Sequence, residues 1–151
     1  MADFQSSIII HKPVKEVFDY LLTLENIPEI MPNVVRLEKL SEGSIGKGTK
    51  LLETRSIRGR EAKAEIEITE FEPNRNYTTK SVAGNITIIY KYFLDEIEEG
   101  TQVRFEANVV IKGLFSFFSR RALVKILEQE DGYLLQYLKE ELEKRETVTQ
   151  I

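Results

Sequence analysis

The chain has 151 residues, of which 42% are hydrophobic, so it is long enough for one domain with a substantial core. Its net charge of −4 argues against a strongly cationic nucleic-acid-binding surface, and its lack of cysteine excludes disulfides and thiolate metal sites. No stretch approaches the roughly 18 apolar residues of a membrane span, and the start shows no signal-peptide pattern, so we expect a cytoplasmic protein without stable membrane insertion. Arg55, Arg58 and Arg60 lie among acidic residues, and we interpret them as part of a solvated strand face.

The chain opens with a predicted strand and two short helices. Residues 4–10 form the strand, and Pro13 stands where proline favours entry into a helix. The first helix carries apolar residues at helical spacing, namely Val14, Val17, Phe18, Leu21 and Leu22. A shorter helix follows Asn26 and ends before Pro32.

From Val34 to Ile111 the turn signals and the alternation of apolar residues predict six hairpin-linked strands. The turns are expected at residues 41–48, 58–59, 73–75, 84–85 and 98–100. The last two strands each show one apolar face, made of Ile86, Ile88, Tyr90, Tyr92 and Leu94, and of Val103, Phe105, Ala107, Val109 and Ile111. This pattern is typical of an antiparallel sheet with one dry face. Residues 51–57 alternate without a clear apolar face, so either face of that strand could point inward.

The end of the chain predicts a long amphipathic helix from about Ser119 to Lys144. Its apolar stripe consists of Leu123, Ile126, Leu127, Leu134, Tyr137, Leu138 and Leu142. Glu130 projects into the middle of this stripe, where an isolated carboxylate costs several kcal/mol unless it is paired, neutralised or hydrated. Gly132 lies nearly opposite the stripe, and a glycine in the middle of a helix costs about 1 kcal/mol relative to alanine. We therefore expect the helix to bend at Gly132.

These elements predict an α+β fold formed by a single domain over residues 1–151. A curved seven-stranded antiparallel sheet grips the long C-terminal helix, and the two short helices lie between strands 1 and 2. Because a curved sheet and one helix do not fill the space between them, we expect a cavity there.

Several short segments carry a family resemblance. They are residues 8–13 (IIIHKP), Val17-Phe18, residues 31–34 (MPNV), 46–49 (GKGT), 70–73 (EFEP), 100–103 (GTQV) and Gly113-Leu114. In this order and spacing the chain resembles the helix-grip superfamily, which includes START lipid-transfer domains, birch-pollen-allergen-like proteins and the polyketide cyclase/dehydrase group. Residues 27–32 also resemble the coenzyme-Q-binding and toxin-associated branch. The resemblance implies a pocket for a hydrophobic ligand but no single reaction.

Glu130 is the best polar candidate, with Tyr133 and Tyr137 one and two turns further along the helix. Three roles are open for its carboxylate. It can pair with an inward arginine or tyrosine of the sheet, anchor a hydroxyl or amine of a ligand, or act as a general acid or base whose pKa burial raises. Catalysis requires a second positioned group, for which the sequence offers only tyrosines.

Other candidates for ligand contact are apolar or aromatic. Tyrosine on the inner sheet face offers apolar area together with a hydroxyl group that can orient a ligand. The phenylalanines that precede the C-terminal helix are candidates for a cavity mouth. The complete set of candidates is Glu130, Tyr133, Tyr137, Leu123, Ile126, Leu127, Leu134, Tyr90, Tyr92, Phe105, Phe115 and Phe118.

The sequence favours binding of a small hydrophobic or amphipathic molecule, such as a lipid, a quinone or a polyketide-like compound, by a carrier or sensor. One alternative is a cofactor-independent cyclase, dehydratase or isomerase that uses Glu130 and a tyrosine. Another is a protein-interaction module of the toxin-associated branch, with a filled interior and an exposed apolar patch. The single histidine, His11, lacks the partners of a metal site, so we expect no metal and no cofactor. The sequence does not fix the oligomeric state.

Overall fold

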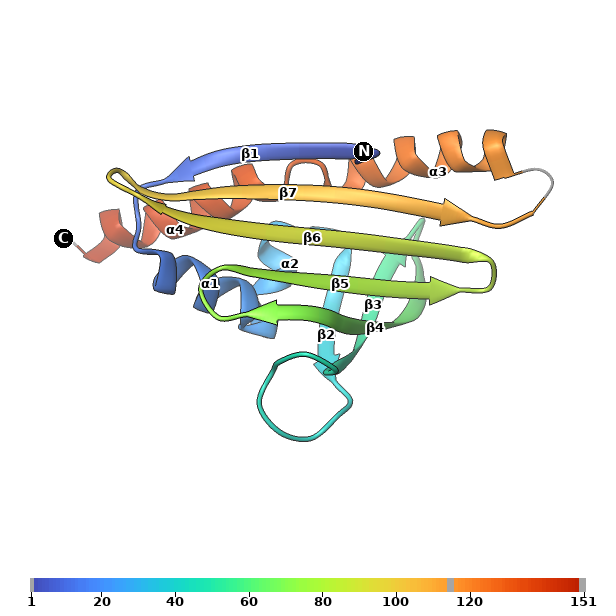
Figure 1. Cartoon of the computed structure of the whole chain (residues 1–151), viewed down its shortest axis with the longest axis horizontal. Helices are drawn as coiled ribbons and strands as arrows, with labels where there is room; N and C mark the ends of the chain where they lie inside the picture. Colours follow the sequence, from blue (N-terminus) through green and yellow to red (C-terminus); the bar gives the residue numbers. More distant parts are fainter. Residues whose placement is uncertain (1, 114–115, 150–151) are drawn as a thin grey trace.

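The computed structural model describes residues 2–113 and 116–149, and describes side chains within residues 2–113 and 120–144. One antiparallel sheet has the strand order β1-β7-β6-β5-β4-β3-β2, so the first strand pairs with the last (Figure 1). The strands are β1 (Phe4–Ile10), β2 (Val34–Lys39), β3 (Lys50–Ile57), β4 (Arg60–Glu72), β5 (Asn76–Ala83), β6 (Ile86–Ile97) and β7 (Gly100–Ile111). The helices are α1 (Val14–Leu22), a 3-10 turn at Leu24–Asn26, α2 (Ile27–Ile30), α3 (Ser116–Asp131) and α4 (Leu134–Thr149). The predicted seven-stranded sheet, short helices and C-terminal helix are therefore confirmed.

The strand boundaries follow the turn signals of the sequence. The hairpin between β3 and β4 turns at Arg58 and Gly59, which both adopt positive φ angles of 52° and 79°. Two central residues with positive φ match the right-handed twist of the flanking strands, and glycine adopts this conformation without steric cost. The other four predicted turns also fall between observed strands, except that Gly100, placed in the last turn, is the first residue of β7.

The C-terminal helix is interrupted at Gly132 and Tyr133, where the sequence predicts a bend. α3 ends at Asp131 and α4 begins at Leu134. A Cβ atom built on Gly132 would lie 2.3 Å from the carbonyl oxygen of Glu128, which is closer than real Cβ contacts come. The junction between the two helices therefore requires glycine for steric reasons.

Replacing Gly132 with alanine is expected to destabilise the protein by about 1–3 kcal/mol, because the added methyl group forces the backbone apart. In an ordinary helical position the same change stabilises a protein through chain entropy. Urea unfolding of the wild type and Gly132→Ala measures the difference. A more stable variant would contradict the steric account of this junction.

One half of the inner face of the sheet is filled by aromatic and aliphatic side chains. Tyr77 stacks on Tyr92 with ring centroids 4.4 Å apart, and Phe105 packs against Tyr92 and Tyr90. α1, α2 and α4 cover this half, and the buried residues that they contribute are Val17, Phe18, Tyr20, Leu21, Ile27, Ile30, Leu134, Leu135, Leu138 and Leu142. The predicted inner face of β6 and β7 is thus confirmed, and it is buried from Tyr90 to Leu94 and from Val103 to Val109, whereas Ile86, Ile88 and Ile111 are half-buried.

The described side chains leave the other half of the inner face partly uncovered. It lies towards the β3–β4 and β5–β6 turns, where cross-strand pairing places small and branched side chains, together with Arg60, on the inner side. We call this region the open half; its residues, all exposed or half-buried, are Ile57, Arg60, Ala62, Ala64, Ser81, Ala83, Ile86, Ile88 and Ile111. Helix α3 packs on β7, at the far edge of this region from β3 (Figure 1).

At the end of the sheet away from the open half, a polar link attaches α4 to β1 and to the residue that follows it. The backbone N–H of His11 donates to Glu143 Oε2 at 3.2 Å, and Lys139 Nζ donates both to Glu143 and to the Ile9 carbonyl at 2.7 Å. Partial burial raises the pKa of Glu143, but these hydrogen bonds and the nearby positive charges outweigh it. The net pKa lies below the ordinary value of 4.5.

This lowered pKa predicts a contribution of Glu143 to the pH dependence of stability. A carboxyl group with a depressed folded-state pKa stabilises the fold above its unfolded pKa, and the stabilisation is lost as the pH falls through the folded value. The difference in unfolding free energy between the wild type and Glu143→Gln is therefore expected to shrink below about pH 4.5. Urea unfolding between about pH 3 and pH 7 tests this, and a difference that is constant over that range would disprove it.

Candidate functional site

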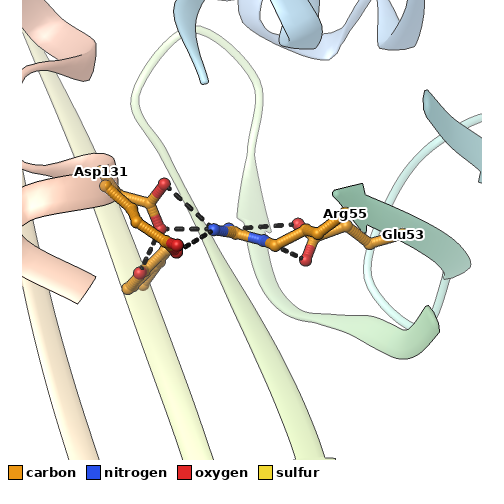
Figure 2. A network of polar contacts seen from close by, with 5 residues as sticks. Glu53, Arg55 and Asp131 are labelled. Carbon is orange, nitrogen blue, oxygen red and sulfur yellow. Dashed lines mark hydrogen bonds and ion pairs between the residues drawn. The ribbon is translucent and has the colours of Figure 1, made fainter. Parts of the chain in front are cut away.

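A network of charged side chains joins β3 to the end of α3, with Arg55 at its centre (Figure 2). The guanidinium donates from Nη1 and Nη2 to Asp131 at 3.2 and 3.0 Å, and from Nε to Glu53 Oε1 at 2.7 Å. Glu130 Oε2 lies 3.3 Å from Nη1. Register explains this geometry, because Arg55 pairs with Ala62 and Glu53 with Ala64, so both charged residues occupy the inner face.

Asp131 is the most deeply buried member of the network. Its side chain is 1% exposed, and its Oδ2 also accepts a hydrogen bond of 2.6 Å from the hydroxyl of Tyr90. Burial and the Asp131 charge both raise the pKa of Tyr90, so its phenol stays protonated and donates. Burial alone would lower the pKa of Arg55, but the charges of Asp131 and Glu53 outweigh it and raise that pKa. The Arg55 guanidinium therefore stays charged.

Glu130 occupies the role of an ion-pair partner for an inward arginine, one of the three roles that its place in the helix left open. Its side chain is 21% exposed and contacts Arg55 at the border of the open half. The buried acid of the helix, however, is the neighbouring Asp131, which sequence reasoning missed. The interpretation of Arg55 as part of a solvated face was wrong, because its side chain is only 12% exposed and is paired with three acids.

The predicted site residues fall into separate places. Leu127 and Leu134 are buried, Leu123 is half-buried, and Tyr90, Tyr92 and Phe105 form part of the aromatic core. Ile126, Tyr133 and Tyr137 are exposed large hydrophobic residues on the outside of the C-terminal helices. Phe115 and the side chain of Phe118 lie outside the described residues. The network therefore brings together two predicted residues, Glu130 and Tyr90, with the unpredicted Glu53, Arg55 and Asp131.

Chemically, the network can accept hydrogen bonds at the edge of an apolar surface. The described residues contain no group of histidines and acids arranged to hold a metal ion. Among the helices described, none is long and apolar enough to cross a bilayer.

A pocket of about 620 Å³ lies elsewhere, beside α1. It is lined by Pro13, Lys15, Glu16, Asp19, Tyr20, Thr23 and Asn26. It is separate from the predicted cavity between the sheet and the C-terminal helix, and that cavity stays a prediction.

The fold is shared with several solved structures. The chain resembles Ara h 8.0201 with a TM-score of 0.68 and 16% identity, over 93% of this chain and 97% of that one. It resembles TTHA0849 from Thermus thermophilus with a TM-score of 0.70 and 21% identity, over 90% of this chain and 93% of that one. The di-domain ARO/CYC StfQ from the steffimycin biosynthetic pathway gives a TM-score of 0.76 and 16% identity, over 95% of this chain and 52% of that one.

At these identities the similarity establishes the helix-grip fold. No curated protein matches the sequence. The family described as "Polyketide cyclase / dehydrase and lipid transport" matches residues 1–143. The chain therefore belongs to this family.

Proposed function

We propose that the protein binds a small amphipathic molecule whose apolar part lies on the open half of the inner sheet face. Its polar end would contact the Arg55 network. Membership of the family supports a ligand-binding or a cyclase role. The single observation that carries the proposal is the half-filled inner face, with a charged network at the border between its filled and open parts.

The composition of the open half supports an apolar occupant. Arg60, beside the β3–β4 turn, is the one charged residue of the open half. Ala62, Ala64, Ser81 and Ala83 leave room above the strands, whereas the outer sides of β4 and β5 carry charged residues such as Lys63 and Lys80. Covering apolar surface releases about 25 cal/mol per Å². A ligand that covers this surface is stabilised by this burial, whereas water in the same place leaves the surface hydrated.

The polar groups of the network already have hydrogen-bond partners within the protein, and this favours binding over catalysis. Glu130 is paired with Arg55, and the hydroxyl of Tyr90 donates to Asp131. A general acid or base needs a positioned proton-transfer partner facing the substrate. Tyr133 and Tyr137, the partners that the cyclase alternative suggested, are exposed on the outer side of the helices. An interaction module, the other alternative, would have a filled interior, which the open half does not support.

The test is a titration with Nile red, a neutral dye whose emission rises in apolar surroundings. We expect the wild type to bind the dye, and Ser81→Phe to weaken binding about tenfold because the new ring fills the open half. The matched control is Val82→Phe, since Val82 is the next residue of β5 and is exposed on the outer face. Equal binding by all three proteins, or none by the wild type, would contradict the proposed function.

A further inference from the structure

We propose that the protein docks on anionic membrane surfaces through the end of the sheet that carries the β3–β4 turn, the β5–β6 turn and the last residues of β7. The contact is peripheral, without insertion of a helix, and it goes beyond the proposed function. It follows from the distribution of charge over the molecule and from the exposed aliphatic side chains that lie among the cations.

Unpaired cations gather at this end of the sheet. Antiparallel pairing directs both turns and the end of β7 to the same end, where the backbone N–H of Lys112 donates to the Asn85 carbonyl at 3.1 Å (Figure 1). Helix α3 starts there too, and Arg120 Nε donates to the Val109 carbonyl at 3.0 Å. Five exposed cations of this region have no carboxylate partner among the described side chains. We call them the basic end; they are Arg58, Arg60, Lys63, Lys112 and Arg121.

The acids beside the basic end are already paired. Glu61 Oε1 lies 3.8 Å from Arg36 Nη2, and Asp3 forms an ion pair with Arg120. Much negative charge lies at the opposite end of the sheet, where residues 95–99 of the β6–β7 hairpin include four exposed acids. A chain with a net charge of −4 therefore has one positive end, and this separation of charge turns that end towards an anionic surface.

Exposed aliphatic side chains accompany the cations. Ile57 pairs with Arg60, and Val82 and Val110 flank Thr87 on the outer side of the sheet; all three aliphatic residues are exposed. Cations beside aliphatic side chains match the charged head groups of a bilayer and the apolar boundary beneath them. A nucleic-acid backbone would use the cations and leave the aliphatic side chains in water, so the combination favours a lipid surface.

The backbone of Arg58 supports a role for the β3–β4 turn. Its φ of 52° lies in the left-handed region, where glycine, asparagine and aspartate are the usual residues. Strain of this kind is typical of functional positions. Arginine at this position adds a cation at the tip of the hairpin, which asparagine or glycine would not supply.

The experiment is sedimentation of the full chain with phosphatidylcholine vesicles that contain about 30% phosphatidylserine, compared with vesicles of phosphatidylcholine alone. We expect the wild type to bind the anionic vesicles and not the neutral ones. Raising NaCl from about 0.05 M to about 0.5 M should release the protein, because salt screens exposed charges. Equal binding to both kinds of vesicle, or binding to neither, would overturn the inference.

The double variant Arg58→Asp with Lys112→Glu should weaken binding to the anionic vesicles at least about thirtyfold, because each cation near an anionic surface contributes about fivefold. Aspartate tolerates the left-handed conformation at position 58. The matched control is Lys47→Glu with Arg75→Glu, which reverses two exposed cations in the turns at the opposite end and gives the same net charge. The control should bind the vesicles within about threefold of the wild type.

Thermal melting verifies that both double variants are folded, and titration with Nile red should give wild-type affinity for each, since none of the four residues lies on the open half. Equal loss of vesicle binding by the two double variants would show that net charge alone acts, and would overturn the inference while the proposed function stands. Tighter binding of the wild type to single-stranded RNA than to the anionic vesicles would assign the basic end to nucleic acid and overturn it as well.

Discussion

Replacing Arg55 with methionine is expected to lower the free energy of unfolding by about 3–5 kcal/mol at pH 7. Methionine keeps much of the side-chain volume but removes the charge, so Glu53, Glu130 and Asp131 are left facing one another in a site with little water. Removing one partner of a buried ion pair is far more costly than the net value of the pair, because the remaining charge loses its compensation. Three carboxylates share this one cation. Urea unfolding measures the loss.

The control for this prediction is Arg60→Met. Arg60 lies at the start of β4, on the same hairpin, and is exposed. Its replacement should change stability by no more than about 0.5 kcal/mol. If Arg55→Met were as stable as this control, Arg55 would not compensate the buried acids, and the network would not be the structural centre described above.

Asp131→Asn and Tyr90→Phe are each expected to destabilise the protein by about 1.5–3 kcal/mol, because each change removes a hydrogen bond to a buried charged group. The two groups share the 2.6 Å bond between the Tyr90 hydroxyl and Asp131 Oδ2. The double variant should therefore lose less than the sum of the single variants, with a coupling energy of about 0.5–3 kcal/mol.

Tyr137→Phe is the control for the loss of a tyrosine hydroxyl, since Tyr137 is exposed on α4. It should be nearly neutral. Strict additivity of Asp131→Asn and Tyr90→Phe in urea unfolding would show that the hydrogen bond between them contributes nothing to stability.

The sheet was predictable because its signals are local. Turn residues such as Gly59 and Gly84 mark the hairpins, and the alternation of β6 and β7 identifies the dry face without knowledge of the rest of the chain. The bend at Gly132 was predictable for the same reason, since a glycine within a helical pattern is a local conflict.

The charged network was not predictable, because its members meet only through the fold. Arg55 and Asp131 lie 76 residues apart, and the alternation of β3 does not reveal which face points inward. At about 100° per residue the buried Leu127, Asp131, Leu134 and Leu138 all lie within about 60° of one another, so Asp131 is inside the buried stripe and Glu130 is at its edge. The sequence therefore identified the right region of the helix and the wrong acid as its buried member.

The open half carries no signal of its own in the sequence. Alanine and serine at positions 62, 64, 81 and 83 are common on any strand, and only the register of β3 to β6 shows that they share one face. Their significance comes from their full or partial exposure, which is a property of the whole fold.

The most direct test of the proposed binding site is isoleucine methyl NMR during a titration with Nile red. Four isoleucines, Ile57, Ile86, Ile88 and Ile111, lie on the open half, whereas Ile10, Ile27 and Ile30 lie in the filled half. We predict that the dye shifts the methyl signals of the first group and leaves those of the second nearly unchanged. Shifts confined to the second group, or to the exposed Ile126 on the outer side of α3, would contradict the binding site proposed here.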